Sequence, residues 1–498
     1  MIRYKKIMSI AMSMVVMATA FSTNVFAVAC CPCIDKDRGR RVTISNTGVV
    51  DLPDNYPGIG KIIVPEGRQY GEVEAVNINA NVSKLVGTFE GCTGLTGIKI
   101  PCNVTKIGDN TFSGCTSLKK VEIENITKEK KVIDVGGNGA SAYSACCDKN
   151  SNYHDTYEKN LGVETIGNSA FKGCTELPSI NIPNSVTKIG DNAFMDCEEL
   201  DSIKIPDSVT SIGDNAFSGC KNLKEVTIGD GIKIIPKNAF YNCTNLDKIT
   251  IGNKVWKIEE NAFDGCGKLD KIKIPNTVTE ISKDAFEGCT SFKKVTIDSQ
   301  NIVNDFSKIF NDLQIEEVII GDNVEKIGVV FKGCKSLEEV TIGKGIKTID
   351  EMAFMGCENL ETVLISESVE NIDEMAFMGC ISLKNVKIIN SEEKQNNSNY
   401  KEKQSNHNNV VGKMAFATCT KLKKIDIPKT VKTIDKYAFM GCLELSEVYI
   451  PDKTQKICEF AFACCPNLKK VSLLNKEVER VGYAFAGDET NFTYRSNP

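Results

Sequence analysis

The chain has 498 residues, of which 41% are apolar and 25% charged, a composition typical of folded soluble proteins and not of disordered ones. Its formal net charge of -5 becomes -8 without Arg3, Lys5 and Lys6, so no basic field is available to hold nucleic acid. Nucleic-acid binding is therefore excluded. A single globular core is also not expected at this length, unless the chain is a repeat protein.

Residues 1–29 have the pattern of a signal peptide. Basic residues are followed by an apolar run from Ile7 to Phe21 and by small residues that end at Ala27 and Ala29. The apolar run is too short for a membrane-spanning helix. We expect cleavage after Ala27 or Ala29. The second cut would make Cys30 the first residue and a candidate for lipidation, which is the one membrane attachment that we expect.

A repeat of 23 residues dominates residues 76–487, and self-similarity of this kind predicts a solenoid. Each repeat contains one Phe at a fixed position, which we call the marker Phe. A Cys stands three residues after each marker Phe except the last, and a Leu, or Phe292 in one repeat, stands six residues after it. In most repeats, β-branched residues stand nine and eleven residues after the marker Phe. Residues 30–75 fit poorly and are predicted to be an N-terminal cap, and 488–498 a C-terminal tail. The markers are Phe89, Phe112, Phe171, Phe194, Phe217, Phe240, Phe263, Phe286, Phe331, Phe354, Phe377, Phe416, Phe439, Phe462 and Phe485.

Each repeat predicts one coil with two short strands. The alternation Leu-x-x-Ile-x-Ile places apolar side chains on one face of a strand, and a following Pro ends the strand because it lacks an N–H. A second apolar pair, such as Val209 and Ile212, precedes the turn Gly-Asp-Asn-Ala-Phe. No coil can bury its apolar face alone, so the coils must stack with parallel strands about 4.8 Å apart.

Two segments interrupt the period, residues 124–162 and 390–409, and both begin directly after the first strand of a coil. Because both insertions begin at the same point of a coil, we expect them to leave the solenoid from the same edge.

A degenerate coil at 298–315, around Ile309 and Leu313, explains why Phe286 and Phe331 are 45 residues apart, where two periods would give 46.

The cysteines and histidines argue against catalysis and against a metal site. The cysteines in phase with the repeat form an inward-pointing line, which suits packing as small apolar residues better than metal ligation or disulfides. Out-of-phase cysteines, among them Cys102, Cys458 and Cys464, are expected to be exposed, and a local disulfide between the last two is left open. Only His154 and His407 exist, and both lie in the insertions, so no nucleophile–His pair fits within the repeats.

The sequence of 205–223, Ile-Pro-Asp-Ser-Val-Thr-Ser-Ile-Gly-Asp-Asn-Ala-Phe-Ser-Gly-Cys-Lys-Asn-Leu, resembles the BspA-like class of bacterial leucine-rich repeats, and the resemblance covers about residues 76 to 487. It implies a leucine-rich-repeat superhelix of about 15–16 coils of 23 residues. Parallel β-strands would lie on the concave side, with turns and short helical pieces opposite. Members are typically exported or surface-exposed and are associated with adhesion to host matrix proteins and to other cells.

The resemblance predicts an exported, non-enzymatic protein without a cofactor, at the cell surface or secreted, that binds extracellular proteins or other cell-surface macromolecules. The alternative is a structural surface or matrix component that associates with itself. We expect binding at outward positions of the concave strands, namely Lys204, Lys273, Lys387, Asp426 and Tyr449. A Tyr-rich site in the first insertion, with Tyr143, Tyr153 and Tyr157, is the competing location.

Overall fold

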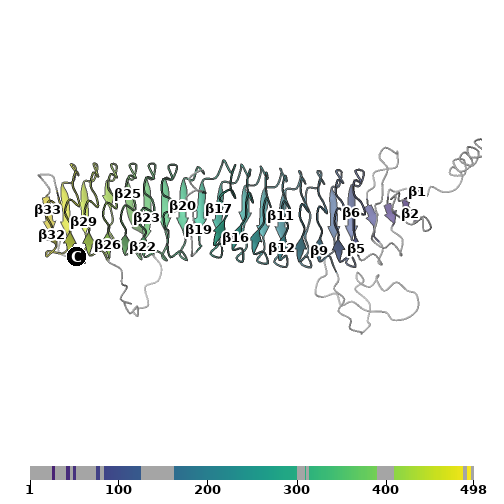
Figure 1. The fold of residues 1–498 in the computed structure, drawn as a ribbon, viewed down its shortest axis with the longest axis horizontal. Helices are drawn as coiled ribbons and strands as arrows, with labels where there is room; N and C mark the ends of the chain where they lie inside the picture. The colour runs from purple at the N-terminus through teal and green to yellow at the C-terminus, as the bar shows by residue number, and fades with distance from the viewer. Residues whose placement is uncertain are drawn as a thin grey trace, which may run out of the picture. The chain divides into compact units, whose positions relative to one another are not determined.

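In the described part of the chain, two compact units are found, Met1–Asp201 and Ser202–Pro498, and both are built from stacked coils with parallel strands (Figure 1). Little of this part is helical, and none of its helices is long and apolar enough to cross a membrane. The computed structural model describes residues 25–28, 41–44, 49–51, 75–78, 84–124, 162–299, 309, 313–389, 409–485 and 491–494.

The first unit has two rows of strands. One row is ordered β1-β2-β3-β4-β6-β8, with antiparallel pairing from β1 to β3 and parallel pairing from there on. Strands β5, β7, β9 and β10 form a second, parallel row. The strands are β1 (Val25–Val28), β2 (Arg41–Ile44), β3 (Val49–Asp51), β4 (Ala75–Asn77), β5 (Lys84–Leu85), β6 (Gly97–Ile100), β7 (Lys106–Ile107), β8 (Lys120–Ile123), β9 (Thr165–Ile166) and β10 (Lys188–Ile189).

The second unit repeats this arrangement. Its longer strands are β11 (Ser202–Ile205), β13 (Glu225–Ile228), β15 (Lys248–Thr250), β17 (Lys271–Ile274), β19 (Lys294–Ile297), β20 (Glu317–Ile320), β21 (Glu339–Ile342), β23 (Thr362–Ser366), β25 (Asn385–Ile389), β27 (Lys424–Ile425), β29 (Glu447–Ile450), β31 (Lys470–Leu473) and β33 (Asn491–Tyr494). Its two-residue strands are β12 (Ser211–Ile212), β14 (Ile234–Ile235), β16 (Lys257–Ile258), β18 (Glu280–Ile281), β22 (Thr348–Ile349), β24 (Asn371–Ile372), β26 (Val410–Val411), β28 (Thr433–Ile434), β30 (Lys456–Ile457) and β32 (Glu479–Arg480).

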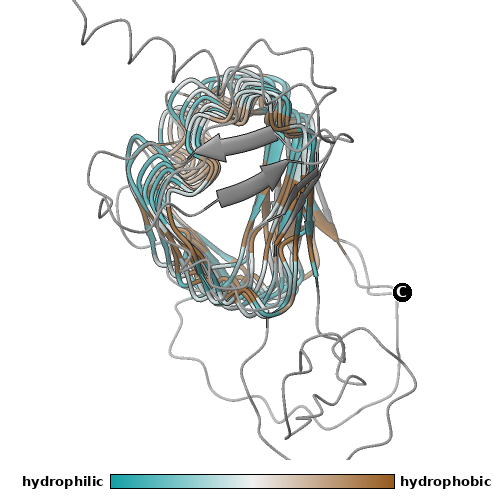
Figure 2. Cartoon of the chain, turned by 90° about the vertical axis from the view of Figure 1, so that its right-hand side faces the viewer, coloured by the Kyte–Doolittle hydropathy of each residue, from teal (hydrophilic) through white to brown (hydrophobic). Residues whose placement is uncertain are grey.

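The predicted solenoid of parallel strands is confirmed, with about 14 turns spaced about 23 residues apart, where the sequence had indicated about 15–16. Within a strand, burial alternates as expected: Ile203 and Ile205 are buried and Lys204 between them is exposed. Ile203 pairs with Val226 exactly one repeat later. Residues of like hydropathy therefore recur from coil to coil (Figure 2). The short helical pieces predicted opposite are turns instead, apart from a single helical residue at Ile309 within the described residues.

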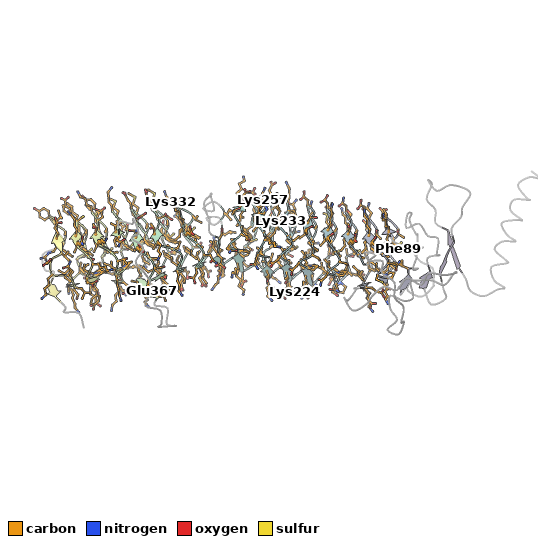
Figure 3. All side chains as sticks on the ribbon, turned by 90° about the horizontal axis from the view of Figure 1, so that it is seen from below. Phe89, Lys224, Lys233, Lys257, Lys332 and Glu367 are labelled. Carbon is orange, nitrogen blue, oxygen red and sulfur yellow. The ribbon has the colours of Figure 1, made fainter. Side chains whose placement is uncertain are left out.

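The marker phenylalanines stack on one another in the core, except at the degenerate coil, where Ile309 stands between Phe286 and Phe331. Neighbouring rings lie 5.1 to 5.3 Å apart, centroid to centroid, in the first unit and 4.9 to 5.5 Å apart in the second. Phe89 lies within the band of side chains in Figure 3 and is fully buried. Phe112 and Phe171 still stack at 5.1 Å although the first insertion separates them, and Phe377 and Phe416 do so across the second. The insertions therefore leave the core stack uninterrupted.

The degenerate coil keeps its place in the stack. Ile309 is buried 23 residues after Phe286, where the repeat would have Phe, and Ile315 is buried where it would have Leu. Leu313, which we had expected to centre this coil, is only half-buried. Val295 pairs with Val318 and Val318 with Val340, steps of 23 and 22 residues, which accounts for the one-residue deficit.

The in-phase cysteines are buried and free, as predicted. Each thiol for which the contact is resolved donates to the carbonyl oxygen of the marker Phe one coil earlier, at Sγ–O distances of 3.0 to 3.3 Å. Of the out-of-phase cysteines, Cys464 is exposed as expected, but Cys102 is buried, so that expectation is wrong for it. Cys458 and Cys464 are both free, which rules out the disulfide left open between them.

Several sequence predictions lie outside the described residues. They include the signal peptide except Val25–Val28, which forms β1, as well as Cys30, both histidines and nearly all of both insertions. Part of the predicted cap forms β2 and β3. Residues 491–494 of the predicted tail form β33, which pairs in parallel with β31, so the row of long strands continues past the last marker Phe.

Candidate functional site

The five outward residues predicted to bind a partner all belong to the second unit and are all exposed. We call the outward side of its longer strands the long-strand face; it is the side that the sequence predicted to be concave. Figure 3 shows Lys224 and Glu367, which flank longer strands, on one edge, and Lys233, Lys257 and Lys332, from the short strands and turns, on the other.

The structure brings three of these five residues together. Lys387 on β25, Asp426 directly after β27 and Tyr449 on β29 belong to three consecutive coils. Lys204 and Lys273 lie several coils away on β11 and β17, and Lys273 is also paired with Asp298 at 2.9 Å. A compact ligand can therefore contact the first three residues but not all five.

The row of long strands is interrupted at Asp426. Strand β27 stops after Ile425, whereas β25 and β29 before and after it have five and four residues. The Asp426 carboxylate accepts a hydrogen bond from the backbone N–H of Ile388 at 3.2 Å, and its own N–H donates to the Val386 carbonyl at 3.0 Å. A side-chain oxygen thus replaces a backbone acceptor, which is how Asp competes with strand pairing.

A groove of about 490 Å³ opens at this interruption. The described residues record one continuous sheet from β17 to β27 and a separate sheet from β29 to β33, so the groove lies where the two sheets meet. Its lining residues are Ile388, Asp426, Ile427, Lys429, Tyr449, Pro451, Asp452 and Leu474.

The lining combines an apolar floor with charged groups at the rim. Ile427 and Pro451 are buried, whereas Tyr449 is 40% exposed. Asp426 and Asp452 supply two carboxylates against the single ammonium of Lys429. An aliphatic stem with a cationic head fits this combination, because the stem can lie along the floor while the head meets a carboxylate or the ring face.

A second hollow of about 480 Å³ lies beside the short strands and is lined by Glu351, Asp373, Glu374, Val410, Gly412, Lys413, Thr433 and Asp435. Lys413 and Glu374 are paired within it at 3.1 Å. Among the described residues, no group of His, Cys, Asp or Glu side chains could hold a metal ion. This hollow has neither an aromatic side chain nor an apolar floor comparable to that of the groove.

Sequence reasoning found Asp426 and Tyr449 but missed the other groove residues. One signal was present: Asp426 occupies an outward strand position that is Thr or Lys in several coils, and Asp is disfavoured in strands. The competing site residues Tyr143, Tyr153 and Tyr157 lie outside the described part of the chain.

Stacked coils, parallel strands and the Leu and Ile positions that fill the core define the chain as a leucine-rich-repeat solenoid. The model of the BspA type leucine rich repeat region matches residues 69–132, 143–266, 219–330, 306–409 and 403–494, which together cover most of the sequence. The chain belongs to this family.

Among solved structures, the chain is similar to a leucine-rich repeat protein from Bacteroides ovatus, with 24% identity over 96% of this chain and 99% of the other, at a TM-score of 0.38. It is also similar to a leucine rich cell surface protein from Faecalibacterium prausnitzii, with 26% identity over 89% and 95% and a TM-score of 0.28. No curated protein matches the sequence.

Proposed function

We propose that the protein is an exported, non-enzymatic binding or adhesion module of a bacterial surface, and that the groove at Asp426 and Tyr449 is the main contact point on its long-strand face. The observation that carries this proposal is the groove itself, formed where Asp426 interrupts the row of strands. Membership of the BspA type family supports a binding role, and the signal-peptide pattern of residues 1–29 supports export.

The partner that fits is an extracellular protein or another cell-surface macromolecule presenting a Lys or Arg side chain. Such a side chain would place its stem against Ile427 and Pro451 and its charge between Asp426 and Asp452. Stacked coils hold these residues in place without ordering a loop on binding, which reduces the entropic cost of association.

The test is binding of the purified chain to a panel of immobilised extracellular-matrix proteins. Asp426→Thr introduces a residue that occurs at the outward position of other coils, such as Thr227, and favours strand, so it should extend β27 and narrow the groove. Tyr449→Ser introduces the residue present at the paired position Ser472. Each change should weaken binding roughly tenfold, a loss typical of a central contact.

Thr227→Ser is the matched control, because it alters an outward position far along the face from the groove. Its binding should equal that of the unaltered chain. Unchanged binding in both groove variants would contradict the assignment of the groove.

A further inference from the structure

The type of residue that stands two positions before each marker Phe changes along the second unit. In three earlier coils of this unit the position is Asn, at Asn215, Asn238 and Asn261, with φ between 54° and 56°, and in the fourth it is Asp284. From Phe331 onward it is apolar or aromatic in every coil, and the residues are Val329, Met352, Met375, Met414, Tyr437, Phe460 and Tyr483.

Five of these seven residues hold a backbone conformation that disfavours them. Met352, Met375, Met414, Tyr437 and Phe460 have φ between 55° and 59°, in the left-handed region. Asn and Gly adopt this region readily, whereas long or aromatic side chains do so at a cost in free energy. The folded chain thus places apolar side chains at the surface where Asn would be both more soluble and less strained.

A second apolar row runs beside the first. The residue after the marker Phe donates its N–H to the carbonyl at the strained position, as Met355 does to Met352 and Met378 to Met375, both at 3.1 Å. The two rows are therefore opposite ends of the same turns. We call their half-buried and exposed apolar members the apolar strip: Val329, Met352, Met355, Met375, Met378, Met414, Tyr437, Met440, Phe460 and Tyr483.

The strip is apolar and has a balanced rim. Tyr437, Phe460 and Tyr483 stack face to face at 5.6 and 5.8 Å, so their faces already cover one another and offer little to a sugar ring. Of the charges beside the strip, Lys413 pairs with Glu374 and Lys436 with Glu459, at 3.1 and 3.3 Å, and the Lys332 ammonium contacts the Met352 sulfur at 3.5 Å. These features favour an apolar partner over a charged or carbohydrate one.

We propose that the apolar strip is a self-association surface that binds the same strip of a second copy of this chain. A second copy presents side chains at the same spacing, so contacts stay in register over all seven coils. An amphipathic helix has a similar pitch of about 5.4 Å, but its apolar stripe winds away from a straight strip by about 20° per heptad.

The extent of the strip also fits a pair of copies. Val329 is 53% exposed and Tyr483 71%, and the Met side chains add half-buried area along roughly 30 Å of stacked coils. Burial of the whole strip would remove on the order of 600 Å² from each copy, close to the roughly 800 Å² per partner of a specific interface. In a two-fold dimer the same surface of both copies meets itself, so the apolar strip of one copy would pack against the apolar strip of the other.

The test compares sedimentation equilibrium of the full chain with that of the variant Met375→Asn, Met414→Asn, Tyr437→Asn, Phe460→Asn. Asn is the residue of earlier coils at this position and tolerates the left-handed conformation, so the variant should melt at the same temperature or higher. We expect the unaltered chain to dimerise at micromolar concentration and the variant to dimerise at least about tenfold more weakly.

The matched control removes two exposed aromatic side chains outside the strip, with Tyr241→Ser and Trp256→Thr, the residues found one repeat away at 218 and 279. The control should dimerise as the unaltered chain does. An unaltered chain that stays monomeric at about 100 µM overturns the proposal. Binding of an amphipathic helical peptide or of lipid vesicles by such a monomeric chain would assign the strip to that partner instead. A variant that dimerises undiminished overturns the proposal as well.

Discussion

The thiol of Cys243 donates a hydrogen bond to the backbone carbonyl of Phe217, one coil earlier, at 3.2 Å. The same oxygen accepts the N–H of Cys220 at 3.3 Å, so the thiol occupies its second lone pair. Because this contact recurs along both units, the cysteines connect successive coils as well as filling space between them.

Substitution at Cys243 separates hydrogen bonding from packing. Cys243→Ala removes the donor and leaves a small void, whereas Cys243→Ser keeps a donor of nearly the same size. If the bond to Phe217 stabilises the fold, the Ser variant should be the more stable of the two by about 1 kcal/mol in urea unfolding. Simple apolar packing predicts the reverse order, because a buried hydroxyl costs more than a methyl group.

The buried thiols should make the fold sensitive to alkali. Burial raises the pKa of Cys115 and of Cys289 from 9.0 to about 12. The folded state therefore keeps these protons while the unfolded state loses them, so stability is complete below pH 9 and decreases as the pH rises toward 12. Each such thiol contributes a slope of about 1.4 kcal/mol per pH unit.

Urea unfolding at pH 8 to 11 measures this slope. Replacing Cys115 and Cys289 together with Ala should make the free energy of unfolding fall less steeply with pH, by the contribution of about two protons. Deprotonation of lysines affects both proteins alike and so cancels in the comparison. Equal slopes in the two proteins would show that these thiols do not remain protonated in the folded state.

Phe217 and Lys204 should differ sharply when each is replaced with Ala. The Phe217 ring is fully buried and stacks on Phe240 at 5.4 Å, so its loss should cost roughly 3–5 kcal/mol. Lys204 is exposed on β11, and its loss should change stability by less than about 0.5 kcal/mol. Chemical unfolding of the two variants checks this, and equal midpoints would mean that the repeat has been placed in the wrong phase.

The period of the sequence was enough to predict the buried Phe, Leu and Ile positions, because each coil can bury them in only one way. It could not predict the groove, which depends on the Asp426 carboxylate taking the Ile388 N–H and ending β27 early. The left-handed backbone conformation of Met375 could not be predicted either, because the path of the coil sets its φ and Met itself does not favour that conformation. The burial of Cys102 does not follow from the period either, because a residue out of phase with the repeat can lie on either side of a coil.

Export makes a prediction about the N-terminus. If residues 1–29 are a signal peptide, mass spectrometry of the protein from its native host should find a mature chain that begins at Val28 or Cys30. A diacylated Cys30 would identify a membrane-anchored form. A chain that still begins at Met1 would contradict export.

The last prediction distinguishes the long-strand face from the first insertion as the binding surface. The coils on both sides of the insertion already stack, with Ile107 paired to Ile166 and Phe112 against Phe171. Residues 124–162 can therefore be replaced by Pro-Asp-Ser, the residues at 206–208, which restores the regular distance from Ile123 to Val163. This replacement should leave both stability and binding to a matrix protein unchanged.

The companion variant changes Lys204, Lys273 and Lys387 on the face to Glu. Partners that are acidic should associate more slowly and with less dependence on salt, because rim charges act mainly on the association rate. Partners that present Lys or Arg should instead associate at the same rate or faster, and they should lose affinity with the groove variants Asp426→Thr and Tyr449→Ser. Surface plasmon resonance at two salt concentrations measures both effects. Loss of binding only when residues 124–162 are replaced would move the site to the insertion that carries Tyr143, Tyr153 and Tyr157, and would leave the stacked coils as its rigid support.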